Sequence, residues 1–144
     1  MSADRVARIG RLVDARRAAA DSVVIELDAC AIAVARAGDA AAEARDVWFS
    51  AMSRAPVMDS SAELADESAY AVALGRRYEM SLRVLDDAKT RHEACRRRLC
   101  AARTEVKKLE KIRDRLLAHA AAEGGRHEQR SADAVAAARG ARTP

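Results

Sequence analysis

Apolar side chains recur along the chain at alternating intervals of three and four residues, in two long series. The first series runs from Val6 to Ala51 and has 13 apolar members out of 14, and the second runs from Ala71 to Ala120 and has 12 out of 15. A mean spacing of 3.5 residues is the signature of helices that pack as a left-handed coiled coil. The pattern therefore predicts two long helices, each with one narrow apolar seam.

The seams are defined by their members. The first seam is Val6, Ile9, Val13, Arg16, Ala20, Val23, Leu27, Cys30, Val34, Ala37, Ala41, Ala44, Trp48 and Ala51. The second seam is Ala71, Leu74, Tyr78, Ser81, Leu85, Ala88, His92, Cys95, Leu99, Ala102, Val106, Leu109, Arg113, Leu116 and Ala120.

The segment between the seams predicts a short connection. Pro56 ends the first helix and restricts Ala55. Ser60 and Glu63 have the spacing of a capping box, so the second helix should begin near Ser61. A short connection folds two such helices antiparallel. We therefore expect an all-α fold, a long antiparallel two-helix coiled-coil hairpin with a longer second helix.

We expect one helical-hairpin domain over residues 1–144. Its first helix should span about residues 3–54, its turn 55–60, and its second helix about 61–123, with an extension to about 139 and a frayed tail over 140–144. Gly124 and Gly125 are expected to loosen or interrupt the second helix. If the turn centres near residue 57, Val6 lies opposite about residue 108. The second helix would then overhang with an unpaired seam, consisting of Val106, Leu109, Ile112 and Leu116.

Composition supports long helices over a globular core. The chain has 36 alanines but only four aromatic residues, so most of its apolar side chains are too small to fill a compact interior. Trp48 and Tyr78 fall on the seams and should lock the hairpin near its turn. Phe49 and Tyr70 fall beside the seams, which makes them candidates for binding a partner.

Positive charge is concentrated locally. Residues 89–115 hold eleven Lys or Arg against four Asp or Glu, although the whole chain has a formal charge of only +4. Acidic residues interrupt this stretch and no aromatic residue accompanies it, so we expect no nucleic acid. A solvated helix face remains the plain alternative. Exposed apolar side chains flanked by cations favour a protein partner.

Nothing in the sequence indicates catalysis or a cofactor. The cysteines have no paired spacing, His92 and Cys95 lack further metal ligands, and no phosphate-binding loop is present. Cys30 is expected opposite about residue 84, roughly 16 Å along the helix from Cys95, which excludes a disulfide. No uncharged run exceeds eight residues and the N-terminus has no signal-peptide core, so we expect a cytoplasmic protein that does not insert into a membrane.

The C-terminal part of the chain adds a resemblance. The segment KKLEKIRDRLLAHAAAEGGRHEQRSADAVAAAR, on a hairpin with a longer second helix, resembles the FliJ/YscO family of central-stalk proteins in flagellar and non-flagellar type III secretion. Its basic, leucine-containing part is Val106–Leu117. Glu128, Gln129 and Asp133 then precede the alanine and arginine run 134–139.

The resemblance implies a rod that stands in a hexameric secretion ATPase and links it to the membrane export gate, at the cytoplasmic face. Some members of the family also bind secretion chaperones. It implies ATPase contacts for Arg5, Arg8, Arg11, Lys107, Lys108, Lys111, Arg113 and Arg115. Phe49 and Tyr70 would face the gate or a chaperone. The alternatives are a nucleic-acid-binding coiled coil and a small helical chaperone or adaptor that oligomerises through the overhanging seam.

Overall fold

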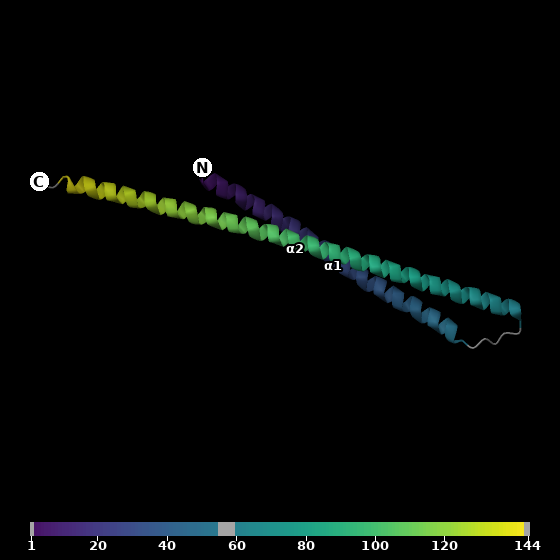
Figure 1. The fold of residues 1–144 in the computed structure, drawn as a ribbon. Helices are drawn as coiled ribbons and strands as arrows, with labels where there is room; N and C mark the ends of the chain where they lie inside the picture. The colour runs from purple at the N-terminus through teal and green to yellow at the C-terminus, as the bar shows by residue number, and fades with distance from the viewer. Residues whose placement is uncertain (1, 55–59, 143–144) are drawn as a thin grey trace. The chain divides into compact units, whose positions relative to one another are not determined.

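Two long helices make up the protein. The computed structural model describes residues 2–54 and 60–142, and these form α1 (Ser2–Ser53) and α2 (Ser61–Gly140) (Figure 1). The helices run antiparallel, because contacts that lie farther from the connection join residues that are farther apart in the sequence. Trp48 contacts Tyr78, and farther from the connection Glu26 pairs with Arg98. The predicted all-α, two-helix coiled-coil hairpin with a longer second helix is confirmed.

Capping fixes the start of α2. The backbone N–H of Glu63 donates to the hydroxyl oxygen of Ser60 at 3.2 Å, and the N–H of Leu64 donates to the Ser60 carbonyl at 3.3 Å. These bonds satisfy amides that have no partner within the helix itself. The predicted turn with Pro56 falls on residues 55–59, which lie outside the described residues.

Gly124 and Gly125 do not interrupt α2, which agrees with the predicted extension to about residue 139, and loosening at the glycines stays a prediction. The helix runs through both glycines to Gly140, and no described glycine has a positive φ. Each glycine costs about 1 kcal/mol relative to alanine in a helix. The flanking residues are mostly strong helix formers, including Ala120, Ala121 and Ala122, and they outweigh that cost.

Contacts divide the chain into two compact units. One comprises residues 22–99, and the other, which we call the terminal unit, comprises residues 1–21 and 100–144. The assignment of the whole chain to one domain stays a prediction. In the 22–99 unit the buried side chains are Val23, Ala37, Ala41, Ala44, Leu74, Cys95 and Leu99, and in the terminal unit they are Val13 and Ala20. All nine are seam residues, and every other seam residue except Arg16 is half-buried. The predicted seams are confirmed.

The predicted register between the helices is wrong. A hairpin centred on residue 57 would place Glu26 opposite Ala88 and Arg17 opposite Arg97. Glu26 instead pairs with Arg98, at 2.6 Å, in the 22–99 unit, and Arg17 pairs with Glu110 in the terminal unit. The observed register differs from the expected one because the connection between the helices is asymmetric. Residues 61–70 are all exposed, so α2 runs for ten residues before its first half-buried position, Ala71.

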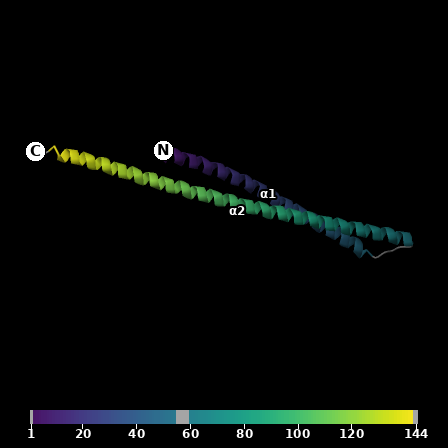
Figure 2. The same cartoon turned by 45° about the horizontal axis from the view of Figure 1, so that its top comes forward.

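This register moves the overhang towards the C-terminus. Val106, Leu109 and Leu116 are half-buried in the terminal unit, while Ile112 lies beside the seam and is 44% exposed. Three of the four residues of the predicted overhanging seam therefore pack within the chain, and Ile112 does not. Ala120 is the last half-buried position, and all residues from 121 to 142 are exposed. Figure 2 shows this end of α2 continuing beyond the start of α1.

Candidate partner-binding surfaces

The two units differ in charge. The terminal unit has fifteen Lys or Arg against nine Asp or Glu, a formal charge of +6, whereas residues 22–99 have eleven against thirteen, a formal charge of −2. The eight cations named as ATPase-contact candidates all belong to the terminal unit. Their sequence positions place them on two helices, and the structure brings residues 1–21 of the chain and residues 100–144 into one unit.

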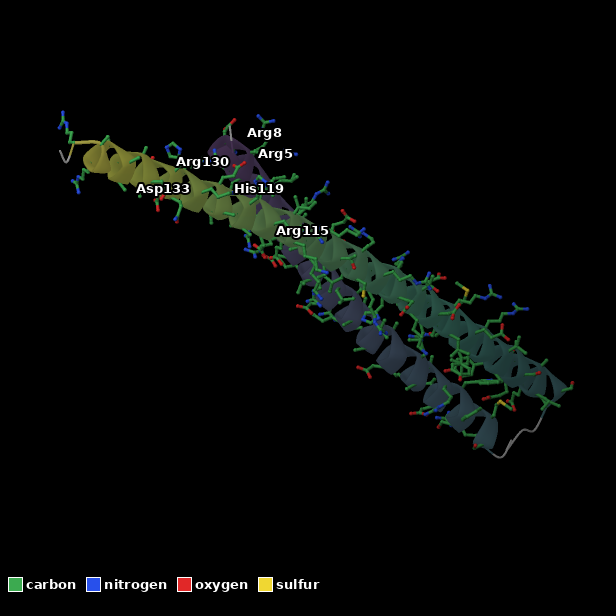
Figure 3. All side chains as sticks on the ribbon, turned by 60° about the vertical axis from the view of Figure 1, so that its left-hand side comes forward. Arg5, Arg8, Arg115, His119, Arg130 and Asp133 are labelled. Atoms are coloured by element: carbon green, nitrogen blue, oxygen red, sulfur yellow. The ribbon has the colours of Figure 1, made fainter. Side chains whose placement is uncertain are left out.

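The three arginines of α1 are exposed. Arg8 lies 3.8 Å from Asp4, one helical turn away, and both side chains are 76% exposed. No ion pair involves Arg5 or Arg11 among the described residues. Figure 3 shows Arg5 and Arg8 near the start of α1, in the same unit as Arg115 of α2. Surface pairs of this kind hold a side chain weakly, so all three arginines are available to a partner.

The five cations of α2 fall into two groups. Lys108 pairs with Glu105 at 3.1 Å, and Arg113, a half-buried seam residue, pairs with Asp114 at 3.1 Å. The other three are exposed and form no ion pair with any described residue; these are Lys107, Lys111 and Arg115. We call these three the free cations of α2. They are the side chains best placed to meet an anionic partner.

Two ion pairs between the helices were not anticipated from the sequence. Arg17 donates from Nε at 3.1 Å, and also from Nη2, to Glu110, and Arg98 donates to Glu26 at 2.6 Å. The hydrogen bond from Arg17, together with the charge of Glu110, raises the pKa of the Arg17 guanidinium. With the correct register, the flanking positions of the two seams would have indicated both pairs.

Aromatic side chains form a second surface in the 22–99 unit. Trp48 lies between Phe49 and Tyr78, with ring centroids 5.4 Å and 5.8 Å apart. Trp48 and Tyr78 are half-buried on the seams, whereas Phe49 is 51% and Tyr70 54% exposed.

Tyr70 lines a groove of about 680 Å³ with Glu43, Asp46, Val47, Ser50, Ala51 and Arg54. Phe49 is not among the lining residues of that groove. The two candidates are both exposed but belong to different local surroundings, and their role in binding stays a prediction.

The cysteines are closer than the sequence suggested. Cys95 is buried between Val23 and Leu99, and Cys30 of α1 packs against the same cluster. Burial raises the pKa of the Cys95 thiol, and the neighbouring Cys30 contributes to the rise by its charge and by a hydrogen bond. The predicted separation of about 16 Å is wrong because it rested on the wrong register.

The described residues contain neither a metal-binding cluster nor a helix that could span a membrane. Residues 2–54 and 60–142 contain no cluster of three or more His, Cys, Asp or Glu side chains placed to hold a metal ion. Within the same residues, neither helix has a stretch apolar enough to cross a bilayer.

Comparison with known proteins identifies the family. The profile of the FliJ family, described as "Flagellar FliJ protein", matches residues 11–144. No curated protein and no solved structure was found to match the chain. The family match covers the first seam from Val13 onwards, the whole second seam, the terminal unit from Arg11 onwards and the exposed end of α2. The chain therefore belongs to the FliJ family, whose members are components of the flagellar and type III protein export apparatus.

Proposed function

We propose that the protein is the non-enzymatic central stalk that links the hexameric ATPase of this apparatus to the membrane export gate. The observation that carries the proposal is the charge of the terminal unit, +6, set against −2 for residues 22–99. A stalk needs one end that recognises the ring and another that recognises something else, and this chain has two chemically different surfaces.

The terminal unit supplies the ring-binding surface in this proposal. Exposed cations come from both helices, with Arg5 and Arg11 on α1 and the free cations on α2. A ring whose inner wall is acidic would attract these side chains and orient the protein as it enters. Lys108 and Arg113 would contribute less, because each is already paired with a neighbouring acid.

The aromatic surface serves the second partner in this proposal. Exposed Phe49 and Tyr70 offer large contact areas at a low cost in conformational entropy, as is common at binding hot spots. We assign them to the export-gate protein or to a secretion chaperone. The protein would then work at the cytoplasmic face of the membrane, without entering it.

Reconstitution with the cognate ATPase tests the stalk proposal. We expect the protein to co-purify with the ATPase and to change its rate of ATP hydrolysis. Replacing Lys107, Lys111 and Arg115 with Glu should weaken the association by about tenfold or more. A matched control replaces Arg36, Arg83 and Lys89, which are exposed cations of the 22–99 unit, and should leave it unchanged.

Equal loss in both triple variants would argue against a ring-binding terminal unit. No association and no change in the rate would contradict the stalk proposal altogether. Tight binding to duplex DNA, with a steep dependence on salt, would instead favour the nucleic-acid alternative.

For the second surface, Phe49→Ala and Tyr70→Ala should each weaken binding of the gate protein or chaperone in a pull-down, with Val135→Ala of the terminal unit as the control.

A further inference from the structure

Two thiols from different helices meet inside the 22–99 unit. Cys95 of α2 is only 4% exposed and belongs to the core cluster with Val23 and Leu99. Cys30 of α1 is half-buried and packs against that cluster. The Cys95 thiol donates to the Val23 carbonyl at 3.8 Å. Cys30 and Cys95 therefore meet at one core cluster across the seam.

Helix packing distances allow a disulfide at this point of the hairpin. Ala37 of α1 and Ala88 of α2, two small seam residues, line the groove that contains Cys30, so the helices can approach closely beside it. Packed helices lie about 8–10 Å apart, and each Cα stands about 2.3 Å from its axis, which leaves roughly 3.4–5.4 Å between Cα atoms that face each other, a range that overlaps the one found in disulfides. Disulfides join Cα atoms about 4.4–6.8 Å apart.

Access to the two thiols is unequal. Cys30 lines a groove of about 400 Å³ together with Ala29, Ala33, Ala37, Val84, Asp87, Ala88 and Arg91. Cys95 does not line this groove. A small oxidant can reach Cys30 from solvent while Cys95 stays covered.

We propose that Cys30 and Cys95 form a disulfide between α1 and α2 when the protein meets hydrogen peroxide. In the first step the Cys30 sulfur attacks one oxygen of the peroxide, an S–O bond forms, the O–O bond breaks, and Cys30 becomes a sulfenic acid as water leaves. In the second step the Cys95 sulfur attacks the Cys30 sulfur, and the sulfenic oxygen leaves as a second water. The two thiols lose two electrons and the peroxide gains them.

The roles of the two cysteines differ in this scheme. Cys95 is covered by the core and burial raises the pKa of its thiol, so it reacts slowly with a peroxide in solution, but it is held close to Cys30 to complete the bond. A thiol reductant reverses the reaction by exchange. The bond would close a loop that contains the connection between the helices, and would fix their register at this point of the seam.

The test uses the full chain with Cys100→Ser, which removes the exposed third thiol. After treatment with hydrogen peroxide and alkylation of free thiols, we expect a protein lighter by two hydrogens with no alkylated cysteine. Trypsin should release one cross-linked species that joins residues 18–36 to residues 92–96. The thermal midpoint of helix loss should rise and then return to its starting value with dithiothreitol.

The same treatment of a Cys30→Ala, Cys100→Ser variant is the control. Alanine already occupies other positions of the same seam, such as Ala37 and Ala41, so this variant should fold. Its Cys95 should stay alkylatable after unfolding, and its melting should not respond to peroxide or reductant. The proposal is overturned if the Cys100→Ser protein yields a Cys30 sulfinic acid with Cys95 still free, a dimer linked through Cys30, or no oxidation of either thiol.

Discussion

Gly75 lies against the indole ring of Trp48, and this contact decides which side chain fits there. A Cβ on Gly75 would stand 3.2 Å from Cε2 and Nε1 of the ring, whereas a Cβ on Gly124 would meet nothing within 4 Å. Gly75→Val should push the ring from its place and cost about 1–3 kcal/mol of unfolding free energy. Gly124→Val should raise the unfolding free energy by a few tenths of a kcal/mol, because valine favours the helix more than glycine does.

Fluorescence measures this directly, because Trp48 is the only tryptophan in the chain. We expect a red-shifted emission and a lower thermal midpoint in Gly75→Val, and neither change in Gly124→Val. Unaltered emission in Gly75→Val would mean that Trp48 does not pack on this glycine.

Cys95 gives stability a dependence on pH. Burial is the largest cause of its raised pKa, followed by the charges of Cys30 and Glu26. The folded protein therefore holds this proton at a pH where the unfolded chain, with an ordinary thiol pKa of 9.0, has lost it. The stability that the protonated Cys95 thiol contributes is fully present below its pKa in the unfolded chain, and it is lost as the pH rises through its pKa in the folded protein.

Thermal unfolding between about pH 8 and pH 10 tests this dependence. The midpoint should fall with rising pH in the wild type and in Cys100→Ala, and it should fall less steeply in Cys95→Ala. Parallel curves for all three proteins would exclude a role for Cys95.

At the scale of the helices, burial could be predicted and register could not. The 3.5-residue period marks every seam position, and 28 of the 29 positions are buried or half-buried, with Arg16 as the exception. Sliding one helix past the other by one repeat keeps apolar side chains in contact, so the period cannot fix the pairing. The pairing depends on the exposed residues 61–70, whose lack of packing leaves no mark on the pattern of the seams.

The same contrast between predictable burial and unpredictable register applies to the candidate sites. Exposure of the basic and aromatic candidates was predictable from their positions beside the seams, with Arg113 as the half-buried exception. The ion pair between Arg17 and Glu110 and the contact between Cys30 and Cys95 depend on register, so both were missed. Which of the α2 cations are paired locally depends on rotamers, which helical position alone does not determine.

Leu109 tests the register at the level of the helix. Because it is half-buried in the terminal unit, Leu109→Asp should lower the unfolding free energy by about 2–4 kcal/mol through burial of an unpaired carboxylate. Val135→Asp is the matched control, since Val135 is 53% exposed on the unpacked end of α2 and should tolerate the change.

Circular dichroism during heating distinguishes the two variants. We expect an earlier loss of helix in Leu109→Asp and an unchanged curve in Val135→Asp. Identical melting curves for the two variants would show that Leu109 has no partner in α1. That result would support the expectation from the sequence that the overhang begins near residue 108.

At the scale of the whole molecule, the two units should bind partners by different forces. The +6 charge of the terminal unit predicts that association with the ATPase weakens as salt is raised from about 0.1 M to about 0.5 M. Binding through Phe49 and Tyr70 should change little over the same range, because apolar contacts are not screened. Titrations of each partner at several salt concentrations measure the two slopes, and equal slopes would contradict this division.

The glycine pair in α2 has a mechanical consequence. Gly124 and Gly125 lie in the exposed segment 121–142, where no packing against α1 restrains the helix. Two glycines make this step about 2 kcal/mol easier to open than two alanines would. A bending load on the free end would therefore be absorbed at residues 124–125, and the seam up to Ala120 would keep its alignment while the end beyond it changes direction.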